Sequence, residues 1–289
     1  MHKNLLIIDS PALCHRAKHA MKDAALTHEE MQVEIIFSFL NQILGLAKRF
    51  ETDAFAFAWD SRKSYRTMLY PEYKYKRRTE EKTLEEKAFD NLSYAQFQRL
   101  RREVMPALGF KNNYIQTGLE ADDIIASLVK TYPESIIISR DNDLWQLISS
   151  ETSQFDFQSK KMMTFHTFQE KYYNLAPCFW RRVKAIAGCT TDNVVGIEGV
   201  GSKTAAKYVL ALLPKHYKAF KDIESPAGQE IIKRNEPLVH LPFKGTKKFV
   251  YKKDTLYSKD FYDTFEQLNF QSFINSDSFR EWEEAFNLL

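Results

Sequence analysis

The fold of this chain is decided by residues 120–143, which read EADDIIASLVKTYPESIIISRDND. The apolar residues of 124–129 recur at helical spacing, and 135–139 is a β-branched run typical of a buried parallel strand. Carboxylates therefore stand at element ends, in 120–123 before the helix and in 141–143 after the strand. In α/β folds, sites form at this rim of the sheet.

Two further strand patterns end in a single aspartate. Residues 5–8, LLII, precede Asp9, and residues 54–59, AFAFAW, precede Asp60. A helix cap or an acidic first helical turn explains one such cluster, because carboxylates accept backbone N–H bonds and complement the helix dipole. Repetition at four element ends instead indicates a metal site. Carboxylate oxygens suit Mg²⁺ or Mn²⁺, and a pair of such ions promotes in-line attack on a phosphodiester.

Composition narrows the class of protein. The 289 residues are 44% hydrophobic and 27% charged, which is typical of a globular chain, and no apolar run is long enough to cross a bilayer. No export signal precedes Asp9. Three scattered cysteines, Cys14, Cys178 and Cys189, argue against a disulfide framework. We therefore expect no membrane partner and a cytoplasmic location, in the host cell if the protein is viral. The net charge of +3 identifies no partner by itself.

Helical and strand patterns alternate through the first part of the chain. This alternation predicts an α/β fold with a mostly parallel central sheet and helices on both faces. Expected strands are 5–9, 54–59, 114–115 and 135–139, with a hairpin over 154–165, and expected helices are 29–50, 80–108, 120–131 and 142–148. Helical patterns then follow at 179–187, 203–213 and 279–286. We expect a nuclease core over 1–176 and a helical region over 177–289.

Basic residues and tyrosines alternate between 62 and 78, where Lys and Arg number seven and the only acid is Glu72. Tyrosine rings stack on unpaired bases and cations follow phosphates, so this mixture favours single-stranded nucleic acid. A solvated helix face is the alternative, because glutamates follow from Glu80 onward. The position directly after Asp60 favours the nucleic-acid interpretation.

A glycine-rich turn, GVGSK at residues 199–203, precedes a helical pattern. Ser202 can cap this helix, with Lys203 in its first turn, and exposed N–H groups there would bind a phosphate. The stretch lacks the P-loop spacing and lies between helices, so it is not a nucleotide-binding loop. Either it is a plain loop or it grips a duplex backbone without reading sequence.

Together, the order of parts over 5–213 resembles the flap endonuclease and 5′-3′ exonuclease family, most closely its bacteriophage members. The resemblance implies a PIN-like 5′-nuclease core, a helical arch within 62–95 and a helix–glycine turn–helix module that binds duplex DNA. It also implies two sets of metal ligands. The first set is Asp9, Asp60, Glu120, Asp122 and Asp123, and the second is Asp141, Asp143 and Asp192.

The resemblance further assigns roles in catalysis and DNA binding. Lys74 and Arg77 would contact the scissile phosphate and act with Asp122, while Tyr73 would stack on a base and Arg66 would bind DNA. The turn Gly199-Val200-Gly201-Ser202-Lys203 would bind the duplex, with a K⁺ ion at Gly199–Gly201.

One position departs from the family pattern. Relatives usually read Gly-Asp-x-x-Asp-Asn where this chain has Cys189 after Gly188. A thiol is a poor Mg²⁺ ligand. We interpret Cys189 as a small packed residue.

The expected function is a structure-selective 5′-nuclease, acting as a monomer with two Mg²⁺ or Mn²⁺ ions. Its substrates would be branched, flapped or nicked DNA and RNA-primed DNA, in replication and repair. One alternative is a DNA-binding replication accessory protein with attenuated hydrolysis, which Cys189 permits. Another is a toxin-type ribonuclease, which explains neither the arch nor the glycine turn.

Overall fold

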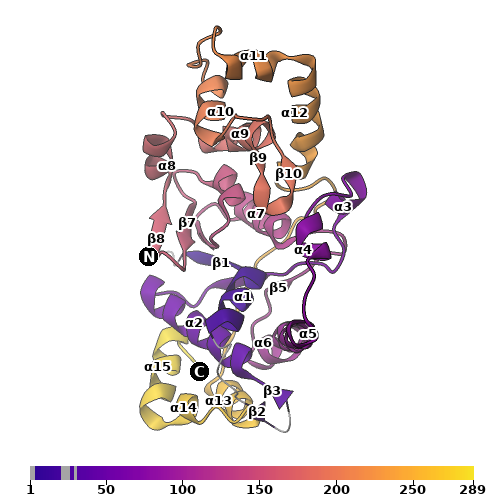
Figure 1. Ribbon diagram of the computed structural model, residues 1–289. Coiled ribbons are helices and arrows are strands. Elements are labelled where there is room, and N and C mark those ends of the chain that lie inside the picture. Colours follow the sequence, from indigo (N-terminus) through magenta and orange to yellow (C-terminus); the bar gives the residue numbers. More distant parts are fainter. Residues whose placement is uncertain (1–3, 21–26, 29–30) are drawn as a thin grey trace. The chain divides into compact units, whose positions relative to one another are not determined.

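The structure is a computed structural model that describes residues 4–20, 27–28 and 31–289 (Figure 1). The chain forms two compact units, each assembled from separate segments. Unit 1 comprises Met1–Trp59, Glu81–Tyr114 and Val250–Leu289, and unit 2 comprises Asp60–Glu80 and Ile115–Phe249. The expected boundary at 176 lies inside unit 2. The functional division at that point stays a prediction.

Three parallel strands form the sheet of unit 1. β5 (Asn113–Tyr114) pairs with β4 (Phe55–Ala58), and β4 pairs with β1 (Leu5–Asp9), with Asp9 opposite Ala58. Every residue of β1 and β4 is buried. Such continuous apolar strands form in parallel sheets because helices cover both faces. The predicted strands are confirmed to within two residues at each end.

The helices of unit 1 follow the apolar periodicity, but two of them begin later than predicted, and the one expected from residue 80 begins at Leu84. They are α1 (Ser10–Ala20), α2 (Glu34–Phe50) and α5 (Leu84–Arg99), which continues through a π-helical turn (Leu100–Val104) into α6 (Met105–Ala107). The helix predicted from residue 29 begins at Glu34, because Met31–Gln32 pairs as strand β3 with β2 (Thr27–His28). Residues 29–30 lie outside the described part. Gly109 ends the third helix with a φ of 87°.

The last forty residues complete the core of unit 1. They form α13 (Ser258–Gln267), α14 (Gln271–Ile274) and α15 (Ser276–Phe286), so the terminal helix is confirmed. Phe286 of α15 packs 5.6 Å from Phe55 of β4 and 5.7 Å from Phe110, centroid to centroid. Phe261 of α13 lies 6.1 Å from Phe110. This segment therefore buries the aromatic side chains of the sheet.

Unit 2 carries the second group of strands. β6 (Ser135–Ile138) runs parallel to β7 (Ser153–Asp156), and β7 pairs antiparallel with β8 (Lys161–Met163), which confirms the hairpin. Helix α7 (Ala121–Thr131) precedes β6 as predicted, whereas Asn142–Leu147 is a 3₁₀ helix, η2. Two short helices, α3 (Tyr65–Leu69) and α4 (Tyr75–Thr79), lie in the basic stretch. The main strands of the chain pair mostly in parallel, so the predicted α/β class is confirmed.

The remainder of unit 2 is helical and packs around α9 (Trp180–Ala187) (Figure 1). Its core includes Trp180, Ile186 and Val200. The other elements are α8 (Phe165–Lys171), η3 (Pro177–Phe179), α10 (Ser202–Val209), α11 (Lys218–Glu224) and α12 (Pro226–Val239). Between α9 and α10, strands β9 (Gly188–Cys189) and β10 (Val194–Val195) form a small hairpin around η4 (Thr190–Asp192). Among the described residues, we find no helix of the length and apolarity that a membrane span requires.

Candidate active site

Acidic side chains of unit 2 gather at the start of α7. Glu120 is the residue before the helix, and Asp122 and Asp123 lie in its first turn. Asp60, which follows β4, accepts a hydrogen bond at 2.8 Å from the backbone N–H of Ala121. The free N–H groups and positive dipole end of a helix stabilise carboxylates there. The structure thus brings together four of the five carboxylates predicted for the first metal set.

Besides Arg66, which is described below, three residues of the basic stretch contact Glu120 or Asp192. The Tyr73 hydroxyl lies 2.8 Å from Glu120 Oε2 and 3.1 Å from Asp192 Oδ2. Lys74 Nζ lies 3.0 Å from Glu120 and 4.0 Å from Asp192, and Arg77 lies 3.1 Å from Asp192. The backbone N–H of Lys74 also donates to the Asp192 carbonyl at 2.8 Å. The proposed phosphate-binding cations therefore share one cluster with the proposed metal ligands.

Burial and charge act against each other in this cluster. Burial alone would lower the pKa of Lys74, but Glu120 and Asp192 raise it above its ordinary value. Burial alone would raise the pKa of Glu120, but Lys74 and Arg66 lower it. For Asp192, burial prevails over Lys74 and Arg77 and raises the pKa. Lysine and glutamate thus hold each other in the charged form, as close opposite charges do.

A second group of donors joins η2 to the β9–β10 hairpin. One ligand atom each from Asp143, Cys189 and Asp192 lies within 4.8 Å of the others. Asp143 donates its backbone N–H to Asp141 Oδ1 at 2.8 Å. Burial, and then the charge of Asp143, raise the pKa of Asp141. One cation could touch two carboxylates and a sulfur here, so the residues fit a divalent metal ion with a mixed oxygen and sulfur donor set.

The hairpin geometry depends on Gly188. Its φ is 77°, and a Cβ added there would lie 2.4 Å from the carbonyl oxygen of Val194. Only glycine tolerates both this backbone conformation and this approach. The close pairing of β9 with β10 places Asp192 at the end of η4, beside Tyr73 and Arg77.

Cys189 is a packed residue, as we expected. Its side chain is buried among Tyr73, Val194 and Leu238. The Sγ atom lies 3.0 Å from the Thr191 hydroxyl. Burial, and then the charge of Asp143, raise the pKa of Cys189 to about 11. The same side chain nevertheless borders two carboxylates, so packing and ligand proximity coexist at this position.

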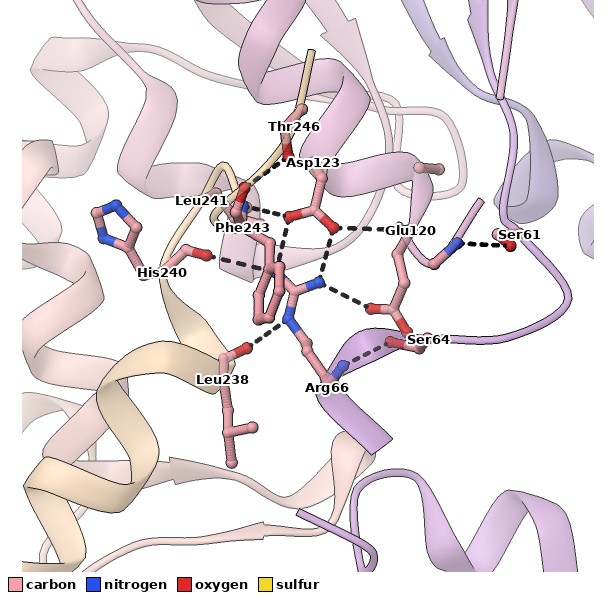
Figure 2. A network of polar contacts seen from close by, with 12 residues as sticks. Ser61, Ser64, Arg66, Glu120, Asp123, Leu238, His240, Leu241, Phe243 and Thr246 are labelled. Carbon is pink, nitrogen blue, oxygen red and sulfur yellow. Dashed lines mark hydrogen bonds and ion pairs between the residues drawn. The ribbon is translucent and has the colours of Figure 1, made fainter. Parts of the chain in front are cut away.

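Arg66 and Asp123 form a buried ion pair at the centre of a larger network (Figure 2). The two guanidinium nitrogens donate to Asp123 at 2.7 and 2.8 Å, and Arg66 Nε donates to the Leu238 carbonyl at 2.8 Å. A fourth contact reaches the His240 carbonyl at 3.3 Å. The Arg66 guanidinium lies 5.0 Å from the centroid of the Phe243 ring. Arg66 is 2% exposed and Asp123 is 0% exposed.

This network corrects two predicted roles. Each oxygen of Asp123 accepts one bond from Arg66, and the backbone N–H groups of Phe243 and Glu120 supply two more. A carboxylate has about four lone-pair sites, so those of Asp123 are all occupied and it has none left for a metal. Arg66 is equally enclosed and presents no surface to DNA. Both residues hold the site together in this structure.

Tyr73 also differs from its predicted role. Only 3% of it is exposed, because its ring packs on Cys189 and Leu238. It therefore orients Glu120 and Asp192 through its hydroxyl and offers no face to a base.

The remaining predicted residues lie in separate places. Asp9 belongs to unit 1, where it is buried at the end of β1 and accepts a bond from the Ala12 N–H at 3.1 Å. In unit 2, the residue that caps α10 is Gly201, without a side-chain bond, so Ser202 is the first helical residue instead. Val200 is buried and Lys203 is exposed. Among described atoms, nothing lies within 4 Å of a Cβ built at Gly199 or Gly201, so this backbone is open to a second surface.

Lys184 also belongs to this site, although the sequence patterns did not predict it. This residue of α9 is buried, and its Nζ lies 2.6 Å from Asp143 and 3.0 Å from Asn142 Oδ1. Asp143 raises its pKa although burial alone would lower it. A lysine on the apolar face of a helix, between Trp180 and Ala187, was a readable signal, because a buried cation needs a carboxylate partner.

Comparison with known proteins identifies the family of this chain. Residues 4–173 match the family model described as 5′-3′ exonuclease, N-terminal resolvase-like domain. The chain belongs to the 5′-3′ exonuclease family. The expected family resemblance is confirmed, and this is a family of nucleases.

Two kinds of relative share this family. The chain is 28% identical over 251 residues to the 5′-3′ exonuclease of Buchnera aphidicola, covering 85% of this chain and 78% of that protein. It is 30% identical over 215 residues to DNA polymerase I of Mycobacterium tuberculosis, covering 71% of this chain. The chain spans only 22% of that polymerase and 23% of the one from Chloroflexus aurantiacus.

Several solved structures have the same fold as this chain. The bacteriophage T5 5′-exonuclease with bound divalent metal ions (zinc) has a TM-score of 0.69 and 23% identity, covering 98% of this chain and 99% of that one. The catalytic core of Rad2 in complex with a DNA substrate has a TM-score of 0.54 and 15% identity, covering 99% and 92%. These likenesses confirm the 5′-nuclease α/β fold.

Proposed function

We propose that this chain is a structure-selective 5′-nuclease that hydrolyses DNA phosphodiesters near the 5′ ends of flaps and nicks. One observation carries the proposal: Lys74 and Arg77 contact Glu120 and Asp192 within a single cluster. Cations that can neutralise a phosphate thus lie beside carboxylates that can hold metal ions. This pairing suits phosphoryl chemistry, in which charge on the phosphate must be stabilised during in-line displacement.

The residues that would hold the metals fall into two sets. Asp60, Glu120 and Asp122 would hold one Mg²⁺ or Mn²⁺ ion, and Asp9 of unit 1 stays a ligand predicted from the sequence alone. Asp141, Asp143 and Asp192 would hold the other, beside Cys189. Bound ions of this kind lower the pKa of water and stabilise the leaving oxygen. Asp123 lies outside both proposed sets, because Arg66 and backbone groups occupy its oxygens.

The protein side chains have three tasks in this proposal. Lys74 and Arg77 exchange their carboxylate partners for oxygens of the scissile phosphate. Tyr73 keeps Glu120 and Asp192 aligned while that exchange takes place. The open turn at 199–203, with Lys203, contacts the duplex backbone and could coordinate a K⁺ ion through its carbonyls. Backbone contacts of this kind carry no sequence information, which suits action on flapped, nicked and RNA-primed DNA. We further propose that the chain acts as a monomer.

The test uses a 5′-flap duplex, a nicked duplex and an unpaired strand, all end-labelled, with Mg²⁺, Mn²⁺ or EDTA. We expect cleavage close to the branch with either metal and none with EDTA. Tight flap binding without cleavage under every metal condition would instead favour a DNA-binding accessory protein, which the presence of Cys189 keeps as the second candidate.

A further inference from the structure

A pocket of about 780 Å³ opens on unit 2, apart from the carboxylate cluster. Both apolar and cationic side chains line it. Its lining includes Leu69, Phe179 and Phe243 together with Arg181, Arg182 and Lys244. Leu69 is 58% exposed and Phe179 is 49% exposed, so both side chains are accessible to a ligand. The volume is within the range of small-ligand pockets.

The cations around this pocket outnumber the acidic side chains that could neutralise them. Among the described residues that line it, Glu236 is the only acid, against Arg181, Arg182 and Lys244. Within the described part of the chain, Arg182 and Lys244 have no ion-pair partner, and Arg181 faces the ring nitrogen of His240 at 3.0 Å. The pocket is therefore complementary to an anion that also carries an apolar face.

One wall of the pocket is held rigidly by the Arg66–Asp123 network (Figure 2). Arg66 binds the His240 carbonyl, and Asp123 accepts the Phe243 N–H at 2.8 Å. Gln146 adds a bond from its amide to the Val239 carbonyl at 3.0 Å and accepts the Leu241 N–H at 3.1 Å. Backbone fixed by so many bonds keeps the Phe243 ring in place. A preorganised wall lowers the ordering cost of binding.

We infer that this pocket binds a nucleotide of an unpaired strand, with the base against Phe179 and Leu69 and the phosphates against the three cations. The inference rests on the proposed function, because it assigns the pocket to the flap of the same substrate. Binding of a duplex backbone requires only cations. An apolar pocket, by contrast, matches a base that is not stacked in a duplex. Phosphates in turn match cations that lack a protein partner.

The experiment measures the affinity of the full chain by fluorescence anisotropy in EDTA, so that no cleavage occurs. Probes are a labelled oligothymidylate, a 5′-flap duplex and the same nicked duplex without the flap. We expect Phe179→Ala to weaken binding of the first two about tenfold, since base stacking is worth ~1–3 kcal/mol. The flapless duplex should bind as in the parent.

A second variant removes positive charge from the pocket and leaves Phe179 unchanged. It tests the cations even if Phe179→Ala does not fold. Arg182→Gln combined with Lys244→Gln should weaken flap binding and reduce its salt dependence, because two phosphate contacts are lost. Tyr257→Ala is the control, since Tyr257 is also a half-exposed aromatic residue but lies in unit 1. Its affinities should equal those of the parent.

Each other outcome has a distinct meaning. Equal losses on flapped and flapless duplexes would overturn the inference, as would parent-like affinity of both pocket variants. A polyglutamate peptide that binds the parent but not the variants, while oligothymidylate binds all alike, would assign the pocket to an acidic protein and also overturn it. Failure of the parent to cleave any flap with metal would overturn the proposed function, whatever the anisotropy shows.

Discussion

Two cation–carboxylate pairs join the same two segments of unit 2, yet they differ in what they can do. Arg66 and Asp123 share two hydrogen bonds and are 2% and 0% exposed. Lys74 meets Glu120 through one nitrogen at 3.0 Å, and 23% of the Lys74 side chain is exposed. The first pair leaves no bonding capacity, whereas the second can exchange partners. Bonding capacity and access therefore separate a pair that is fixed in the structure from one that can exchange partners.

The chemistry of the two cations reinforces this difference. The planar guanidinium of arginine matches a carboxylate in a fixed fork, and Arg66 uses its other N–H groups on the Leu238 and His240 carbonyls. The ammonium of lysine is a compact charge on a flexible chain, so Lys74 can move from one anion to another. Losing either member of the enclosed pair should harm folding, and losing a member of the open pair should harm catalysis.

The largest effect should follow at Asp122, the neighbour of Asp123. We expect Asp122→Asn to abolish flap cleavage while flap affinity in EDTA stays within about tenfold, because one ligand charge is lost from the metal set. Gel-based cleavage and anisotropy measure the two quantities. If the variant cleaves at the parent rate, Asp122 has no part in the mechanism. The contrast between Asp122 and its structural neighbour Asp123 would then be wrong.

Asp123→Asn should instead lower the free energy of unfolding by about 3–5 kcal/mol, since it leaves the buried Arg66 charge uncompensated. Urea denaturation of this variant beside Asp122→Asn provides the measurement and its control. If the two variants unfold at the same urea concentration, the ion pair does not hold the fold and our structural assignment of Asp123 is wrong.

Lys74→Ala tests the open pair. We expect single-turnover cleavage to fall about a hundredfold, as for loss of one donor to a developing anion, with a modest change in affinity. Lys203→Ala should show the reverse. Its affinity for DNA should be lower and should depend less steeply on salt, by about the amount expected for one lost phosphate contact.

The same Lys74 variant should bind Mn²⁺ more tightly than the parent in calorimetry, because a positive charge beside Glu120 and Asp192 is gone. Parent-like metal binding together with a parent-like rate would show that Lys74 is only a surface ion pair.

The smallest effect concerns Cys189→Asp, which adds a hard ligand beside Asp143 and Asp192. Half-maximal cleavage should shift to a Mg²⁺ concentration several-fold lower, because added carboxylate strengthens capture of a dication. The thermal midpoint without metal should drop, since the new carboxylate would be buried, and Mg²⁺ should restore part of it. An unchanged Mg²⁺ requirement would mean that Cys189 acts in packing alone.

Patterns in the sequence were sufficient for the elements and for the acids, because strand ends and helix starts are local features. The roles of Arg66, Asp123 and Tyr73 could not be predicted in this way. They depend on contacts with Leu238, His240 and Phe243, more than a hundred residues along the chain, and on which lone pairs those groups occupy. Lys184 could be predicted in part. The sequence places it on an apolar helix face, but it does not identify Asp143 as its partner.

The route of the chain has a consequence for its synthesis. Unit 2 ends at Phe249, whereas unit 1 needs Val250–Leu289 to cover Phe55 and Phe110. On a ribosome, all segments of unit 2 have been made while the aromatic core of unit 1 is still incomplete. The part that carries Lys74 and Glu120 can therefore fold first, and the growing chain must keep apolar β4 surface from aggregating until α13 and α15 emerge.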